Sequence, residues 1–315
     1  MSMPAPTPLP PVLQTLRERA RAQRRRIVLP ETADERVLAA RETLEREGLA
    51  EIVWVPEPAL DARFEAIAAL VFERRKHKGM TLPAARQLVA DPIFFAAGLV
   101  ALGHADASVG GATRPTSEVI RAGLTAIGMP PGTETVSSMF LMVREKEVLT
   151  FADCGVVPNP DPPQLATIAW ASACNHRRLT GEEPRIAFLS FSTKGSAQHP
   201  DVTKVREALE VFREQHPQTL ADGELQFDAA YVPAVAERKA KHSKVAGRAN
   251  VLVFPDLDAG NIGYKLAERL GGFLAFGPLL QGLHSPFMDL SRGCSAEDIV
   301  NVAVIASAMT QTEEK

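Results

Sequence analysis

Several features that define large protein classes are scarce or missing in this chain of 315 residues. Its three cysteines, Cys154, Cys174 and Cys294, are too few and too scattered for a disulfide framework or a structural zinc site. No uninterrupted apolar run reaches the roughly 18 residues that suggest a membrane span. The proline-rich start lacks the apolar segment of a signal peptide. These absences favour a soluble, reduced, intracellular protein, and we expect a cytoplasmic location.

Strong charge of either sign is also missing. The formal net charge is −3, which gives no reason to expect nucleic acid or an anionic membrane as a partner. Hydrophobic residues make up 45% of the chain and charged residues 23%, as in ordinary globular proteins. A chain of this length is expected to form two packed lobes.

Common catalytic motifs are absent as well. The chain contains no GxGxxG after a predicted strand, which disfavours a nicotinamide-dependent dehydrogenase. It also contains no HExxH, no GxSxG and no paired CxxC, so metal hydrolysis and the common serine-hydrolase plan lack support. We therefore expect no metal and no bound cofactor.

What the chain does contain is an alternation of short apolar runs with amphipathic stretches. Runs such as RIVLP, EIVWV and RIAFLSF are typical of buried strands, and ADERVLAARETLEREG and DVTKVREALEVFREQ have helical spacing. The alternation indicates parallel βαβ units and the α/β class. One exception is TVSSMFLMVREKEVLTFADC, whose two apolar runs around REKE predict an antiparallel hairpin.

Ligands in α/β proteins gather where strands run into helices, because helix N-termini present free N–H groups. The junction LSFSTKGS places Ser192, Thr193 and Lys194 after a predicted buried strand. Hydroxyls, a glycine and a lysine suit an anion such as phosphate. A polar turn leading into a capped helix is the simpler alternative.

A second junction is FPDLDAGNIGYKLAERL. We expect Asn261 and Tyr264 to lie where the strand turns into the helix, beside glycines that allow close backbone approach to a ligand. An ordinary helix start would explain the same residues.

A basic run occupies residues 74–78 and includes Arg75. Such a run commonly ends a solvated helix, where cations complement the helix dipole. Binding of a phosphate-rich molecule such as coenzyme A is the functional alternative.

The stretch DLSRGCSAEDIV, residues 289–300, precedes an apolar C-terminal helix. Ser295 and Asp298 have the spacing of a capping box, in which each side chain bonds the other's backbone N–H. Arg292 has Asp289 and Glu297 as possible ion-pair partners. The local pattern alone favours a helix cap over a site.

Taken in order, these stretches resemble the phosphate acetyltransferase (phosphotransacetylase) family over nearly the whole chain. The matching segments are RIVLPETADERVLAA, RRKHKGMT, DPIFFAAGLVALGHADASVGGATRPT, FADCGVVPNPDPPQLATIA, LSFSTKGS, GNIGYK and DLSRGCSAEDIV. The resemblance implies reversible acetyl transfer between acetyl phosphate and coenzyme A, with release of inorganic phosphate. It also implies a homodimer of subunits with two α/β/α lobes, similar to the isocitrate and isopropylmalate dehydrogenase fold.

In that fold the last helix returns to the first lobe. We expect residues 1–135 and 280–315 to form the first lobe and residues 136–279 the second, with the active site in the cleft between them. The segment between EIVWV and RRKHKG is shorter than in the family by roughly twenty residues. Arg114 and Pro115 also replace the usual histidine and threonine.

The resemblance assigns roles to individual residues. It implies that Asp298 is the base that takes the thiol proton, that Arg292 holds the phosphate, and that Ser291 donates to the developing oxyanion. Coenzyme A phosphates would be bound by Arg75 and Arg121. The acyl phosphate pocket would be completed by Ser192, Thr193, Lys194, Asn261 and Tyr264.

Three alternatives stay open at this point. In the first, the acyl group is transferred through Cys294 as a covalent intermediate instead of directly. The enzyme could prefer propionyl or butyryl phosphate. The chain could also be a catalytically silent acyl-CoA-binding subunit.

Overall fold

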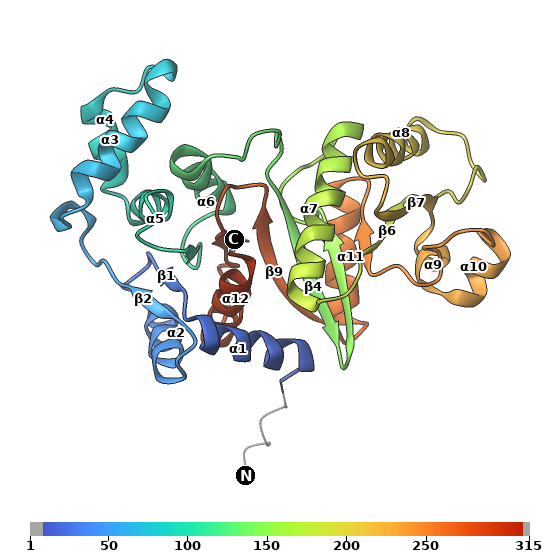
Figure 1. Cartoon of the computed structure of the whole chain (residues 1–315), viewed down its shortest axis with the longest axis horizontal. Helices are drawn as coiled ribbons and strands as arrows, with labels where there is room; N and C mark the ends of the chain where they lie inside the picture. The colour runs from blue at the N-terminus through green and yellow to red at the C-terminus, as the bar shows by residue number, and fades with distance from the viewer. Residues whose placement is uncertain (1–8, 311–315) are drawn as a thin grey trace, which may run out of the picture.

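The computed structural model describes residues 9–310, so most of the proline-rich start, for which no signal peptide is predicted, lies outside the described residues. Two lobes lie side by side (Figure 1). One contains the N-terminal elements, and the last helix returns to it. The other contains the middle of the chain.

The first lobe is built on four parallel strands in the order β10-β3-β1-β2. These strands are β1 (Arg26–Val28), β2 (Glu51–Val53), β3 (Ala107–Gly110) and β10 (Phe287–Asp289). The helices around them are α1 (Pro11–Gln23), α2 (Glu35–Arg46), α3 (Phe64–Arg75), α4 (Leu82–Val89), α5 (Pro92–Ala101), α6 (Thr116–Ala122) and α12 (Ala296–Met309). All strands run the same way, so their carboxyl ends meet along one edge of the sheet.

The second lobe contains six strands in the order β7-β6-β8-β5-β4-β9. They are β4 (Ser137–Arg144), β5 (Glu147–Ala152), β6 (Arg185–Leu189), β7 (Leu220–Leu225), β8 (Val251–Val253) and β9 (Leu274–Gln281). The accompanying helices are α7 (Pro162–Thr180), α8 (Pro200–Gln215), α9 (Phe227–Tyr231), α10 (Pro233–Lys239) and α11 (Leu257–Arg269). The predicted α/β class with mostly parallel sheets is confirmed.

The hairpin predicted around REKE is also confirmed. Strands β4 and β5 pair antiparallel, with Arg144 opposite Glu147 at the turn. Strand β9 adds to the other edge of β4, again antiparallel, while the remaining neighbours in this sheet are parallel. The hairpin thus lies at the side of the second sheet that faces the first lobe (Figure 1).

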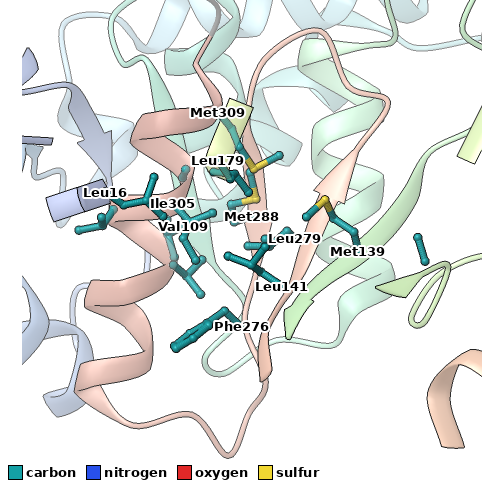
Figure 2. Packing of buried hydrophobic residues seen from close by; sticks show 14 of the residues in the cluster. Leu16, Val109, Met139, Leu141, Leu179, Phe276, Leu279, Met288, Ile305 and Met309 are labelled. Carbon is teal, nitrogen blue, oxygen red and sulfur yellow. The ribbon is translucent and has the colours of Figure 1, made fainter. Parts of the chain in front are cut away.

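A hydrophobic core joins the two lobes through α12. Figure 2 shows side chains from α1, β3, β4, β9 and α12 gathered in one cluster, among them Leu16, Val109, Leu141, Leu279 and Ile305. Each of these five is at most 1% exposed. A helix that is apolar on nearly all sides must be buried, which explains the run NVAVIASAM. The N-terminus of α12 is therefore held where the two lobes meet.

No single described helix is both long enough and apolar enough to cross a membrane. Only α4 and α5 taken together reach that length and composition, and they meet at an angle of 105°.

Candidate active site

The loop between β10 and α12 carries Ser291 and Arg292 and ends at Ser295, which caps α12; the third predicted catalytic residue, Asp298, lies in the first turn of that helix. Ser295 Oγ accepts a hydrogen bond from the backbone nitrogen of Asp298 at 3.2 Å. In return Asp298 Oδ2 accepts from the backbone nitrogen and from Oγ of Ser295, each at 2.8 Å. The predicted capping box is confirmed, and it fixes the Asp298 carboxylate in the first turn of the helix.

Asp298 and Ser291 line one cavity of about 200 Å³ between the lobes. The loop and α12 form one side of this cavity, and β4, β9 and α11 of the second lobe form the other. The residues lining it are Phe140, Tyr264, Glu268, Arg269, Ala275, Phe276, Gly277, Pro278, Leu290, Ser291, Gly293, Cys294, Asp298 and Val302. The structure therefore brings three residues predicted for the site, Ser291, Asp298 and Tyr264, to the same space.

The wall opposite the loop is aromatic. The rings of Phe140 and Tyr264 stack with centroids 4.0 Å apart and an interplanar angle of 16°. Phe276, which also lines the cavity, is 8% exposed. Burial raises the pKa of the Tyr264 hydroxyl, so it remains a protonated hydrogen-bond donor at neutral pH. An apolar wall facing a polar loop suits a small acyl group joined to an anion.

Arg292 lies between the two cavity-lining residues Ser291 and Gly293, and its side chain is exposed. Neither ion-pair partner suggested by the sequence is used: Glu297 pairs with Arg17 at 3.1 Å, and Asp289 bonds Thr116. Within residues 9–310 the Arg292 guanidinium forms no hydrogen bond or ion pair. No carboxylate of the described residues therefore competes for its donors.

Asp289, at the end of β10, is a buried carboxyl group that the sequence analysis did not assign to the site. It is 1% exposed, and its Oδ2 accepts a hydrogen bond of 2.5 Å from Thr116 Oγ1 at the start of α6. Its Oδ1 is buried without a partner among the described residues. Burial raises the pKa of Asp289 to about 7, and the charge of Glu31 acts in the same direction.

Glu31 in turn joins the loops that follow β1 and β3. Its carboxylate accepts from the backbone nitrogens of Ala112 and Thr113, at 2.9 and 2.6 Å. Glu31 therefore ties the ends of β1 and β3 together, and the Thr116–Asp289 bond adds the end of the neighbouring strand β10.

The residues of LSFSTKGS lie elsewhere. Ser192 Oγ donates to Glu224, and the backbone nitrogen of Gln226 donates to Thr193 Oγ1, at 2.9 Å each. Lys194 pairs with Asp222. The structure does not place these three among the residues that line the cavity, and their contacts give them a role in joining β6 to β7. Their part in the acyl phosphate pocket stays a prediction.

The expected position of Asn261 and Tyr264, at the turn from strand to helix, was wrong for both residues. Helix α11 begins at Leu257, capped by Asp256, so Asn261 lies inside the helix and not at the turn before it. Its amide donates to the carbonyl of Cys154 at 3.1 Å. Gly260 explains the tight packing here, because a Cβ at that position would lie 2.1 Å from the carbonyl oxygen of Asp153. Tyr264, one turn further on, does reach the cavity.

The two arginines predicted for coenzyme A lie in the first lobe, outside the cavity lining. Arg75, the last residue of α3, donates to the carbonyls of Leu124 and Thr125. The Arg121 guanidinium lies over the Phe94 ring, 5.0 Å from its centroid. Their binding of coenzyme A stays a prediction.

Arg114, which replaces a histidine usual in the resembling family, is neutralised by two carboxylates. It pairs with Asp91 at 3.0 Å and with Glu118 at 3.1 Å. Pro115 precedes the first residue of α6 and fits a helix start. The Arg114 side chain thus pairs with residues of its own lobe and is not among the residues that line the cavity.

Glu268, Arg269 and Phe276 are cavity residues that the sequence reasoning missed. Glu268 and Arg269 end an amphipathic helix, where charged residues are ordinary, and Phe276 belongs to a strand that was not predicted. No local pattern distinguishes them, since only the packing of the second lobe against the α12 loop brings them to the site.

The family model described as phosphate acetyl/butaryl transferase matches residues 11–59 and 53–307. The two matched segments meet where the sequence predicts a shortened first lobe. Phosphate acetyltransferases of Paracoccus denitrificans and Thermoanaerobacterium thermosaccharolyticum are 46% and 43% identical, each covering 95% of this chain and 99% of the relative. The crystal structure of a phosphotransacetylase from Streptococcus pyogenes superposes with a TM-score of 0.90 at 43% identity, covering 95% of this chain and 98% of that one. This chain therefore belongs to the phosphate acetyl/butaryl transferase family.

Proposed function

We propose that this protein transfers an acetyl group reversibly between acetyl phosphate and coenzyme A. The observation that carries the proposal is the meeting of Ser291 and Asp298 in one cavity, in a chain of this family; Arg292 stands in the chain between the lining residues Ser291 and Gly293. The printed names of relatives at 41–46% identity over nearly the full chain support the same substrates.

The proposed reaction is a direct attack of sulfur on the acyl carbon. Asp298 accepts the thiol proton as the C–S bond forms, and the bond from the acyl carbon to the phosphate oxygen breaks to release inorganic phosphate. A free thiol has an ordinary pKa of about 8.5, so a positioned base is needed near neutral pH. Asp298 Oδ1 forms no hydrogen bond within the described residues and is the oxygen we assign to this step.

Arg292 and Ser291 stabilise the charge that moves during the reaction. Guanidinium binds phosphoryl oxygens through two parallel N–H bonds and keeps its charge, so Arg292 would hold the phosphate before and after transfer. The Ser291 hydroxyl would donate to the oxyanion, a contribution worth about 3 kcal/mol where such donors have been removed. Tyr264 would close the aromatic side of the pocket. The scheme requires no metal and no bound cofactor.

Coenzyme A would lie across the first lobe toward Arg75 and Arg121, with Arg269 at the opposite edge of the cavity. We also propose a homodimer in the cytoplasm. The three free cysteines fit a reducing compartment.

The direct test is thioester formation, followed by ultraviolet absorbance, from coenzyme A with acetyl, propionyl and butyryl phosphate in turn. The proposal predicts the highest kcat/KM with acetyl phosphate, because the cavity is small and walled by Phe140, Tyr264 and Phe276. A preference for butyryl phosphate would contradict acetyl transfer and make the protein a butyryltransferase, the other activity in the family description. No turnover with any of the three would leave a silent acyl-CoA-binding subunit.

A further inference from the structure

Arg36, in the first turn of α2, uses all five of its side-chain N–H groups. Nε and Nη2 donate to the two carboxylate oxygens of Asp34 at 3.0 and 2.8 Å, and Nη2 also donates to the carbonyl of Ala112 at 2.9 Å. Nη1 donates to the carbonyls of Arg292 and Cys294 at 2.8 and 3.0 Å. Five donors in a planar fork thus meet five acceptors.

Three separate segments meet at this one guanidinium. Asp34 caps α2, Ala112 follows β3, and Arg292 and Cys294 belong to the loop that leads into α12 and its Asp298. The other hydrogen bonds of this loop within the described residues are short-range, from the Cys294 nitrogen to the Ser291 carbonyl, from the Gly293 nitrogen to Ser291 Oγ, and from Ser295 to Asp298 of α12. Arg36 therefore fixes the loop relative to the first sheet.

The positive charge of Arg36 is already neutralised by its ion pair with Asp34. Its hydrogen bonds lower the pKa of Asp34, so the carboxylate stays ionised beside it, and Glu31 and the Cys294 thiol also face the guanidinium. All five side-chain N–H groups of Arg36 already meet protein acceptors, so none is left to bind a phosphate.

We propose that Arg36 is a positioning residue of the transferase: it holds the carbonyls of Arg292 and Cys294 so that Ser291, Arg292 and Asp298 converge on one substrate. The predicted loss of kcat rests on the proposed function. The predicted change in the position of the loop rests on the hydrogen bonds alone. Lysine cannot replace Arg36, because one ammonium with three donors cannot span five acceptors in one plane.

The first experiment compares Arg36→Lys and Arg36→Ala with the control Arg41→Lys. Arg41 lies on the same helix, pairs with Glu45 and stacks over Trp54, away from the loop. Arg36→Lys should lower kcat about 10- to 100-fold, as expected for a small misplacement of catalytic groups, while both KM values change less than about threefold. Added guanidinium should restore part of the kcat of Arg36→Ala and none of that of an inactive Asp298 variant.

A second readout follows the loop without using activity. Cys294 is 8% exposed, so the rate at which iodoacetamide alkylates it in the folded protein reports the position of the loop. The extent of alkylation is measured after digestion, on the peptide that contains Cys294. Both Arg36 variants should react several-fold faster at Cys294 than the wild type and Arg41→Lys. An inactive wild type would overturn the proposed function, and the alkylation rates would still decide the positioning of the loop.

Unchanged kcat together with unchanged alkylation in Arg36→Lys would overturn the inference. A rise in KM for acetyl phosphate alone would also overturn it, since that result belongs to a direct phosphate ligand. If Arg36→Lys and Arg36→Ala lost kcat to the same extent, both had a lower melting temperature, and guanidinium rescued neither, Arg36 would be only a general stabilising contact. That result would likewise contradict the inference.

Discussion

Ser295 and Asp298 are joined by three hydrogen bonds: the carboxylate oxygen Oδ2 accepts from the backbone N–H and from the hydroxyl of the serine at 2.8 Å each, and Ser295 Oγ accepts from the backbone N–H of Asp298. The other oxygen, Oδ1, accepts no hydrogen bond within the described residues. A capping residue and a catalytic base are therefore compatible in one side chain, because the two functions use different oxygens.

Removing the cap partner should separate these functions. Ser295→Ala should lower the free energy of unfolding by about 1 kcal/mol, the usual cost of losing such a cap, and leave kcat within several-fold of the wild type. Urea unfolding and steady-state kinetics on the same preparation check both numbers. If kcat instead falls as far as in an Asp298 variant, the cap itself sets the geometry of the base.

Arg292→Lys should reduce kcat severely even though it conserves charge. A lysine offers a single point charge where the guanidinium offers a fork that matches two phosphate oxygens. The side chain is exposed, so the melting temperature should stay close to that of the wild type, and kinetics alone should reveal the defect. Wild-type kcat in this variant would contradict the assignment of the phosphate to Arg292.

Cys294→Ala should retain most of the activity. The thiol is nearly buried, and burial raises its pKa, so little thiolate is available for a covalent intermediate. Direct attack predicts initial-rate lines that intersect when both substrates are varied. Parallel lines together with an inactive Cys294→Ala variant would establish the covalent route.

Asp289 should make stability depend on pH. The pKa in the folded protein is about 7, raised from the ordinary value of 3.8, so the folded state binds the proton more tightly than the unfolded chain. Its contribution is fully present below about pH 4, is lost as pH rises toward 7, and then stays constant. Asp289→Asn, which is always neutral, should gain up to about 1.4 kcal/mol per pH unit relative to the wild type across that window.

Urea unfolding of both proteins between about pH 5 and pH 8 measures this difference. Buried His176 acts in the opposite direction: burial lowers its pKa to about 4, so its contribution to the stability of the protein is lost as pH falls. Both proteins contain His176, so the difference between wild type and Asp289→Asn removes this contribution. Parallel curves for the two proteins would show that Asp289 is ionised throughout the range.

The strong local patterns of the sequence predicted much of the fold. The capping box at Ser295, the hairpin around Arg144 and Glu147, and the alternation of strands and helices all appear in the structure. Each depends on residues close together in the chain, so the sequence contains the needed information.

Strand β7 could not be predicted this way. Its sequence, LADGEL, contains Asp222 and Glu224, which read as a polar turn. In the structure both carboxylates are buried, because Lys194 and Arg213 neutralise Asp222 and Arg206 neutralises Glu224. Tertiary ion pairs of this kind override the local preference for a loop.

The candidate site was likewise only partly predictable. Ser291, Arg292 and Asp298 are neighbours in sequence and were predicted together, and Tyr264 was predicted from the resemblance, whereas Arg269 and Phe276 were missed because only the packing of the second lobe brings them to the cavity. Lys194 was predicted for the pocket from the LSFSTKGS junction and the resemblance; it forms an ion pair with Asp222 of β7, and its part in the pocket stays a prediction. Distances between segments come from packing, and no spacing along the chain reveals them.

The central claim is that Asp298 is the base that takes the thiol proton, and the rate of thioester formation by Asp298→Asn tests it most directly. Asparagine keeps the size of the side chain and can still accept the Ser295 hydrogen bonds through its carbonyl oxygen, so the fold should survive. We predict that kcat falls at least about 100-fold, as expected for loss of a general base, while the KM values for acetyl phosphate and coenzyme A change little. A kcat equal to that of the wild type would leave Asp298 as a helix cap only and contradict the proposed mechanism.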